Sequence, residues 1–398
     1  MQRENLEAAP LASRAIELAQ EAKLMITEGE ADAAIPLLRE AAELHATLQR
    51  DFRASRYNSR SDQREVATLL IDAEASGLAS RRNALKAEAT ALIEAGEYVV
   101  AAERLEEARD VQRELTAQFP DSSEAGSGLL EELEGERQSV LSASTADSIQ
   151  KVRAQLIALL QAREGRDASP LAADFFRGVE QLHANFSASR HLNPEWLLES
   201  RYLNLKRDDL GTIQDAVYSR LVPLPGSADK KMLSNEVSQI LFQLVMGANP
   251  SSQSGNQLPV DSIDFSAAQE FCQRLSWIMA FEVKLPTREE YQAALGEVDR
   301  ALVMRMAWSS QNAERRTHIV GTREANTFGY FDLLGNASEW TADRRTNDER
   351  QILVWGGSVR DTLESLTRVP AVFVSLNERS RFTGFRFVVD FSDASTAE

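Results

Sequence analysis

Residues 1–165 of this chain carry apolar and polar positions at the spacing of amphipathic helices. Two segments resemble each other: MITEGEADAAIPLLREAAELHATL, from Met25, and LIEAGEYVVAAERLEEARDVQREL, from Leu92. Each has a glycine, Gly29 or Gly96, where one helix can end and the next can fold back on it. The pattern therefore predicts an all-α half, built from helical hairpins, over residues 1–165.

The two similar segments start 67 residues apart. This offset is close to twice the roughly 34-residue period of tetratricopeptide-type helix pairs, so the segments resemble that family, with a degenerate unit expected between them. Plain helical hairpins or a coiled bundle explain the same pattern. In each case this half has no polar cluster suited to chemistry, and we expect it to act as a scaffold or partner-binding surface.

From about residue 212 the pattern changes to short strands, turns and aromatic residues. Ser234-Asn235 is expected to cap a helix opening at Glu236, and Asp264 or Ser266 to cap the following one. Thr287 and Glu290 have the spacing of a capping box. We expect a helical bridge over residues 166–211, a domain over 212–392 and a tail over 393–398.

Charge and cysteine content exclude several classes of protein. The net charge is −17, with −13 from residues 1–200, and phosphate binding needs a basic surface, so nucleic acid is not expected as a partner. No apolar run is long enough for a membrane span, and no secretory signal pattern opens the chain. We expect a cytoplasmic protein by default, or a periplasmic or surface protein if the chain is a fragment of a longer one.

A single cysteine, Cys272, excludes an internal disulfide framework and a multi-thiolate zinc site within one chain. It follows Phe271 on a predicted helix, where a lone thiol is more often a core residue than a nucleophile. The four histidines have no spacing that would place two imidazoles on one helix face. A histidine-built metal centre is therefore not expected.

Six segments of the second half occur in the order of a known family's signatures: NEVSQILFQLVMGANPS, LPVDSIDFSAAQEFCQRLS, KLPTREEYQAAL, NTFGYFDLLGNASEWTAD, VWGGSVRD and TGFRFVVD. Residues 212–392 thereby resemble the formylglycine-generating enzyme (sulfatase-modifying factor) family. The resemblance implies an α+β fold related to C-type lectins, with little regular secondary structure.

The part of the fourth segment from Asn326 to Trp340 has two interpretations. In the family, its Gly-Asn-x-x-Glu-Trp portion resembles a calcium-binding loop, and oxygen donors at Asn336 and Glu339 suit a hard cation. The alternative is that both side chains satisfy backbone or arginine groups internally, as an irregular fold requires. Trp340 is expected to need one partner for its indole N–H.

The family's oxidase depends on two closely spaced cysteines that bind copper. Alignment places Glu364 and Val369 at those positions, and neither supplies a soft thiolate ligand. Formylglycine generation is therefore not expected. The iron-dependent branch of the family needs a histidine-built site, for which His45 and His183 are too isolated. Arg360 and Arg386 are expected to form internal ion pairs with Glu339, Asp332 or Asp343, rather than bind a carboxylate ligand.

We therefore expect a non-catalytic binding or regulatory protein that recognises a protein, peptide or glycan. The candidate surface lies between Arg344 and Thr383, where aromatic and arginine side chains are typical of binding hot spots. Its members are Trp355, Arg360, Phe373, Asn377, Arg379 and Arg381. Two alternatives remain open: an enzyme with cysteine-independent chemistry on the same fold, and an assembly protein that acts through its helical half.

Overall fold

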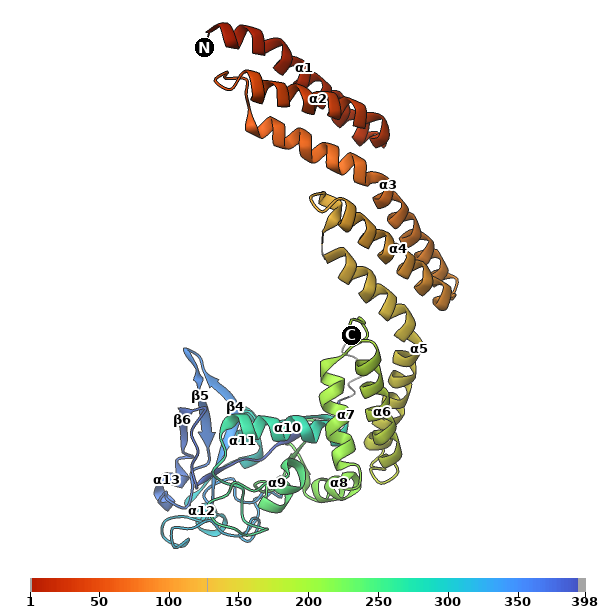
Figure 1. Ribbon diagram of the computed structural model, residues 1–398. Helices are drawn as coiled ribbons and strands as arrows, with labels where there is room; N and C mark the ends of the chain where they lie inside the picture. The colour runs from red at the N-terminus through yellow and green to blue at the C-terminus, as the bar shows by residue number, and fades with distance from the viewer. Residues whose placement is uncertain (1, 127, 393–398) are drawn as a thin grey trace. The chain divides into compact units, whose positions relative to one another are not determined.

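The computed structural model describes residues 2–126 and 128–392, and the predicted tail 393–398 lies outside this part (Figure 1). A helical half is followed by an α+β domain, which confirms the expected fold class. No helix in the described ranges is both long and apolar enough to span a membrane. The helices of the first part are α1 (Gln2–Thr27), α2 (Ala31–Asp51), α3 (Arg60–Glu94), α4 (Tyr98–Gln118), η1 (Ser123–Ala125), α5 (Gly128–Gln161), α6 (Ser169–Asn185), α7 (Pro194–Lys206) and α8 (Leu210–Tyr218).

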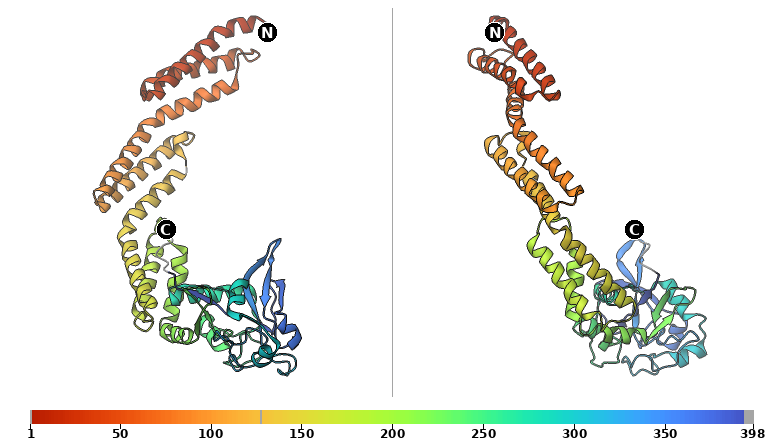
Figure 2. Two further views of the ribbon diagram at one scale, coloured as in Figure 1. Left: turned by 180° about the vertical axis from the view of Figure 1, so that it is seen from behind. Right: turned by 90° about the vertical axis from the view of Figure 1, so that its right-hand side faces the viewer.

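The chain forms two compact units, Met1–Asp147 with Gln181–Leu192 and Ser148–Glu180 with Asn193–Glu398. In the first unit, α1 lies against α2 and α3 lies against α4 as helical hairpins (Figure 2). Buried alanines such as Ala34, Ala41, Ala101 and Ala108 let these helices approach closely. Each repeat of 67 residues contains one pair of long helices, such as α2 and α3. The prediction of a degenerate unit between the two similar segments is therefore wrong.

The hairpin recurs a third time at the same interval. Gly29, Gly96 and Arg163 follow one another at steps of 67 residues and have positive φ values of 88°, 79° and 65°. The N–H of each donates to the carbonyl three residues earlier, and the next N–H reaches the carbonyl five residues earlier. This pair of hydrogen bonds ends α1, α3 and α5 in the same way.

The loops that follow the hairpins repeat as well. The carboxamide oxygen of Asn5 accepts hydrogen bonds from Ser55 Oγ and from the next backbone N–H, both at 3.0 Å. Asp72 does the same for Ser122 Oγ and its following N–H, at 2.8 and 2.7 Å. In the third repeat, the equivalent residue is Ser139, whose Oγ accepts from the backbone N–H of Arg190 at 2.9 Å. One polar side chain on each long helix thus fixes each loop.

The α+β domain contains two small sheets. Their orders are β1-β2-β8-β3 and β6-β5-β4-β7, antiparallel except for the parallel pair of β4 and β7. The elements are β1 (Leu221–Pro223), β2 (Lys230–Leu233), α9 (Gln239–Met246), α10 (Phe265–Met279), β3 (Glu282–Lys284), α11 (Arg288–Leu295), α12 (Arg300–Met306), β4 (Ser338–Arg345), β5 (Asp348–Trp355), α13 (Leu363–Thr367), β6 (Ala371–Ser375), β7 (Thr383–Gly384) and β8 (Val388–Asp390).

A buried glutamine connects the helices of the second unit to this domain. Gln214, on α8, donates to the carbonyl oxygens of Leu160 and Ile278 at 2.8 and 2.9 Å, and accepts from the N–H of Gly165 at 3.1 Å. Its side chain therefore satisfies backbone groups at the ends of α5 and α10, which would otherwise be buried without a partner.

Two of the predicted helix caps are confirmed and one is wrong. Asp264 accepts from the N–H of Ala267, and Thr287 forms the reciprocal capping box with Glu290. However, the helix expected to open at Glu236 begins only at Gln239. The chain stays extended before it because Val237 donates its N–H to the carbonyl of Phe385 at 2.8 Å.

Candidate functional site

The segment from Asn326 to Trp340 is held in place by its own polar side chains. The Asn326 oxygen accepts from the N–H groups of Phe328 and Tyr330 at 3.1 and 3.0 Å. Its amide nitrogen donates to the carbonyl of Ala294 at 2.7 Å. The indole N–H of Trp340 donates to a backbone carbonyl at 3.3 Å, the single partner that we expected.

Glu339 forms a buried ion pair with Arg386, as the sequence led us to expect for this arginine. The guanidinium donates to both carboxylate oxygens at 2.7 Å, and the hydroxyl of Tyr291 donates to the same carboxylate. The two side chains are 2% and 0% exposed. The other guanidinium N–H groups donate to the carbonyls of Ser234 and Phe331 at 3.2 and 3.0 Å. Arg386 therefore joins four segments of the irregular core.

Asn336 and Glu339 do not fit a calcium ion. Asn336 accepts from the N–H of His318 at 2.8 Å and donates to the carbonyl of the same residue at 3.2 Å. Because Arg386 occupies both oxygens of Glu339, neither side chain offers a free oxygen to a hard cation. The arrangement matches the alternative interpretation, in which both residues satisfy internal groups.

Two further buried carboxyl groups interact electrostatically with Arg386 of this ion pair. Glu236 and Asp332 are 0% and 1% exposed, and each has one oxygen without a hydrogen-bond partner among the described residues. Burial, together with the negative charges of Asp332 and Glu339, raises the pKa of Glu236 well above its usual range. Burial also raises the pKa of Asp332, whose other oxygen accepts from the N–H of Gly321 at 2.6 Å. The raised pKa of Glu236 favours its neutral form, which adds no negative charge to the core.

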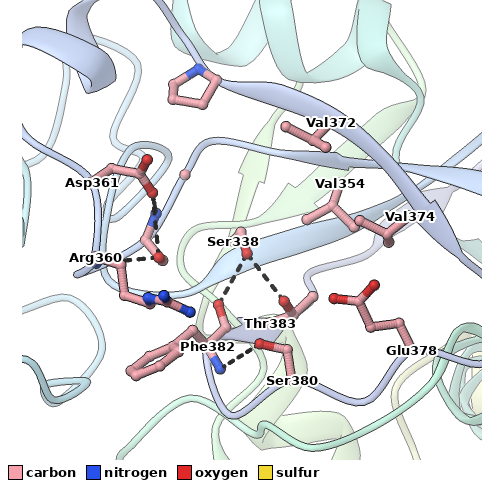
Figure 3. Close-up of a pocket in the computed structure, with 13 residues that line it drawn as sticks. Ser338, Val354, Arg360, Asp361, Val372, Val374, Glu378, Ser380, Phe382 and Thr383 are labelled. Carbon is pink, nitrogen blue, oxygen red and sulfur yellow. Dashed lines mark hydrogen bonds between the residues drawn. The ribbon is translucent and has the colours of Figure 1, made fainter.

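A cleft of about 410 Å³ opens on one face of the β6-β5-β4-β7 sheet (Figure 3). Its floor consists of valines from β5 and β6, with Val354 paired to Val372. Its walls come from the loops before α13 and after β6. The lining residues are Ser338, Val354, Gly357, Ser358, Arg360, Asp361, Pro370, Val372, Val374, Glu378, Ser380, Phe382 and Thr383.

The hydroxyl groups of the cleft are engaged in local hydrogen bonds. Ser338 Oγ lies 3.0 Å from the carbonyl of Phe382 and 3.2 Å from the hydroxyl of Thr383. Ser380 Oγ accepts from the N–H of Phe382 at 3.1 Å (Figure 3). Asp361 accepts from the N–H and hydroxyl of Ser358, a contact within one turn. No histidine or cysteine lines the cleft to act as a base or nucleophile.

Cations border this cleft without a carboxylate partner. The guanidinium groups of Arg360 and Arg381 lie over the ring of Phe382, at 5.5 and 4.7 Å from its centroid. The guanidinium of Arg345 lies 5.5 Å from the ring of Phe373, which alternates with the cleft residues Val372 and Val374 and so faces the other side of β6. Within the described ranges, none of these three arginines forms an ion pair. Their charges are thus available to a ligand.

A family model described as the sulfatase-modifying factor enzyme 1-like domain matches residues 212–391. Residues 212–391 are a domain of this family. The match confirms the resemblance that the six ordered segments indicated. No curated protein sequence matches the chain.

Three solved structures are similar to this chain at low identity. Treponema denticola variable protein 1 is 23% identical, with 40% of this chain and 84% of that chain covered and a TM-score of 0.38. PvdO from Pseudomonas aeruginosa is 14% identical, with 40% and 80% covered and a TM-score of 0.36. CarF is 18% identical, with 41% and 87% covered and a TM-score of 0.34.

The sulfatase-modifying-factor-like domain brings some of the predicted ligand-binding residues together and separates others. Arg360 lines the cleft and Arg381 lies over its Phe382 ring, whereas Phe373 alternates with the cleft valines of β6 and faces the other side of the sheet. Arg379 is bound to Asp264 at 2.6 Å, and Asn377 lies on an exposed turn. The expectation for Trp355 is wrong, because its side chain is 2% exposed and packs in a buried cluster of the domain with Tyr291 and Tyr330.

The two residues that we expected at the positions of the family's catalytic cysteines make only local contacts in this domain. Glu364 is exposed on α13 and pairs with Arg368 at 2.6 Å. Val369, at φ 54°, packs against the same buried cluster as Trp355. Cys272 is buried in α10, and burial raises the pKa of its thiol, so it is a core residue as expected. The described residues contain no group of three His, Cys, Asp or Glu side chains that could hold a metal ion.

Several cleft residues escaped the sequence analysis. Ser338 and Thr383 lie in two of the six ordered segments, but neither was singled out as a site residue. Ser380 lies outside these segments, and Glu378 is one of many exposed acidic residues. The valines of β5 and β6 offered a signal, because their alternation predicts strands with one open face. The sequence contained no information on which face would be open.

Proposed function

We propose that the sulfatase-modifying-factor-like domain is a non-catalytic binding module, and that its cleft takes a segment of a protein partner. The observation that carries this proposal is the lining of the cleft. Valines form its floor, hydroxyl groups and three charged groups, Arg360, Asp361 and Glu378, line its sides, and neither histidine nor cysteine is among them. Such a surface offers affinity and orientation without a reacting group.

A polypeptide suits this cleft better than a glycan does. Sugar rings commonly stack on an aromatic face, but Phe382, the aromatic residue that lines the cleft, already has guanidinium groups over its ring. A valine floor beside a sheet edge is suited to the apolar side chains of a peptide. The helical repeats would then serve as the scaffold on which this domain is presented to its partner.

Selection from a phage-displayed random peptide library on the immobilised full-length chain tests this function. Selected peptides would be synthesised and titrated against the wild-type chain and the Arg360→Gln variant. We expect the variant to bind about tenfold more weakly, because a hydrogen bond to a charged group contributes about 1.5–3 kcal/mol.

The matched control is Arg305→Gln, which removes an arginine of the same domain that pairs with Glu324 and does not line the cleft. We expect its affinity to equal that of the wild type. Failure to enrich any peptide, or equal loss of affinity in both variants, would contradict the proposal.

A further inference from the structure

Strand β6 forms an open edge of the sheet that carries the cleft. The strand order is β6-β5-β4-β7, and β6 pairs on one side only, with β5, over Ala371–Ser375. The valine side chains of β6 face the cleft (Figure 3). An unpaired edge presents a row of backbone donors and acceptors to solvent.

The register identifies which backbone groups are unpaired. The N–H of Gly356 donates to the carbonyl of Pro370, and the N–H of Leu376 donates to the carbonyl of Arg350, at 2.9 and 2.8 Å. Since hydrogen-bonded pairs alternate along antiparallel strands, Val372 and Val374 also face β5. The N–H and carbonyl groups of Ala371 and Phe373 therefore point outward, and they have no hydrogen bond within the described ranges.

The side chains of this edge are unusually apolar for an unpaired strand. Val372 is 59% exposed and Phe373 is 36% exposed. Natural edge strands are commonly protected by charged residues or proline along their length. Residues 371–375 of β6, Ala-Val-Phe-Val-Ser, contain neither. The edge therefore has the composition of a strand that accepts another strand.

The charges around β6 indicate the composition of that strand. Arg360 and Arg381 lie over Phe382 at the cleft, while Arg345 lies over Phe373 on the opposite face of β6. Two carboxylates that line the cleft, Asp361 and Glu378, also form no ion pair in the described part of the chain. Three cations therefore stand against two carboxylates around β6, and this excess of positive charge favours an acidic segment.

We propose that β6 binds an extended, acidic segment of a protein partner as an additional strand of the β6-β5-β4-β7 sheet. This inference rests on the proposed function and specifies its mode. The partner's backbone pairs with the outward groups of Ala371 and Phe373. Its side chains point alternately toward the valines of the cleft, near Arg360, and toward the opposite face, near Arg345.

A synthetic hexapeptide of alternating Glu and Val, with blocked ends, is the probe. Its binding to the full-length chain is followed by fluorescence anisotropy, with the Lys-Val hexapeptide as the matched control. We expect the acidic peptide to bind and the basic peptide not to bind. Affinity for the acidic peptide should fall as salt is raised, because the attracting charges are exposed.

Two substitutions at one position isolate the backbone contact. Phe373→Ala removes the ring and keeps the N–H, whereas Phe373→Pro also removes the N–H, which has no partner within the chain. We expect the proline variant to bind the acidic peptide about fivefold more weakly than the alanine variant, the effect of one hydrogen bond. Glu378→Gln should bind it more tightly than the wild type.

Amide hydrogen exchange of residues 370–376 gives a direct readout of strand pairing. We expect the exchange of this segment to slow when the acidic peptide binds, and to remain unchanged with the basic peptide. Equal affinity of the two Phe373 variants together with unchanged exchange overturns strand addition, while the proposed cleft function stands if library peptides still depend on Arg360. If the acidic hexapeptide does not bind but library peptides do, the acidic composition is wrong.

Discussion

Arg386 and Glu339 are buried together, and each side chain neutralises the charge of the other. The guanidinium also donates to the backbone carbonyls of Ser234 and Phe331, so its removal would leave a buried carboxylate without its countercharge and the carbonyl of Phe331 without a donor. Removing one member of a buried ion pair costs about 3–5 kcal/mol, far more than an exposed pair contributes. The domain is therefore most vulnerable at this residue.

Arg386→Met is expected to lower the free energy of unfolding of the domain by about 3–5 kcal/mol. Urea unfolding followed by tryptophan fluorescence measures it, because all five tryptophans lie in residues 193–398. The control is Arg305→Met, which removes an exposed pair with Glu324 and should change stability by less than about 0.5 kcal/mol. An equal effect of both variants would show that the buried pair does not hold the fold.

Glu236 should make the stability of the domain depend on pH. Its folded pKa is raised by burial, so the folded state holds a proton that the unfolded state releases. The stability that this group contributes is fully present below the unfolded pKa of about 4.3 and is lost as pH rises through the raised folded pKa.

Glu236→Gln is expected to remove this contribution, because an amide keeps the shape of the protonated carboxyl and does not titrate. Urea unfolding over the same pH range should show a stability that falls less steeply with rising pH than in the wild type. The conservative exposed change Glu324→Gln provides the reference. Parallel pH profiles for wild type and Glu236→Gln would mean that Glu236 is ionised in the folded state.

At the scale of elements, the hairpins were predictable because glycine marks two of the three turns. The third copy was missed because Arg163 takes the place of glycine at φ 65°. Its core positions also change volume: Ala41 and Ala108 correspond to Phe175, all buried. When repeats share their packing but not their residue types, the amino-acid sequence does not show the repeat.

The strands of the domain were predicted from their alternation, but the exposure of their residues was not. Trp355 ends β5, whose last four residues are buried on both faces. An alternating pattern predicts an exposed face of a strand only where no second layer packs on that face. Whether such a layer is present depends on residues that are distant in the sequence. The core ion pair could be predicted because Arg386 and Glu339 lie in recognisable motifs, whereas the edge of β6 depends on the strand order.

Two glycines of the α3–α4 hairpin test the role of the turn. Gly77 lies in the interior of α3 and Gly96 at its end with φ 79°, and both have open space where a Cβ would lie. Gly77→Ala should stabilise the helical unit by about 1 kcal/mol through helix propensity. Gly96→Ala should destabilise it by about 1–2 kcal/mol, because an L-residue is strained at positive φ.

Urea unfolding followed by far-UV circular dichroism measures both changes. Since neither added methyl group meets another atom, steric clash does not explain a difference between them. Opposite signs are the expected result. If both variants are stabilised or both destabilised, backbone conformation at residue 96 does not control the turn.

At the scale of the molecule, the two compact units have separate cores. The helical unit buries alanine and leucine between hairpins, and the second unit buries a large aromatic and aliphatic cluster around its two sheets. Each core is formed by residues of its own unit. We therefore expect the two units to unfold in separate transitions, although α5 and α6 run through both.

Two probes separate these transitions in one urea experiment. Tryptophan fluorescence reports only on the second unit, which contains Trp196, Trp277, Trp308, Trp340 and Trp355. Far-UV circular dichroism reports on both units, because helices occur in each. The two curves should not coincide, and the dichroism curve should show an additional transition that fluorescence does not follow.

The variants described above assign each transition to its unit. Gly96→Ala should shift only the transition that dichroism follows and fluorescence does not, and Arg386→Met only the transition that fluorescence follows, because distant sites without shared partners act additively. The double variant should show both shifts, each of its single-variant size. If either substitution moves both transitions together, the chain unfolds as one cooperative body, and α5 and α6 transmit stability between the two cores.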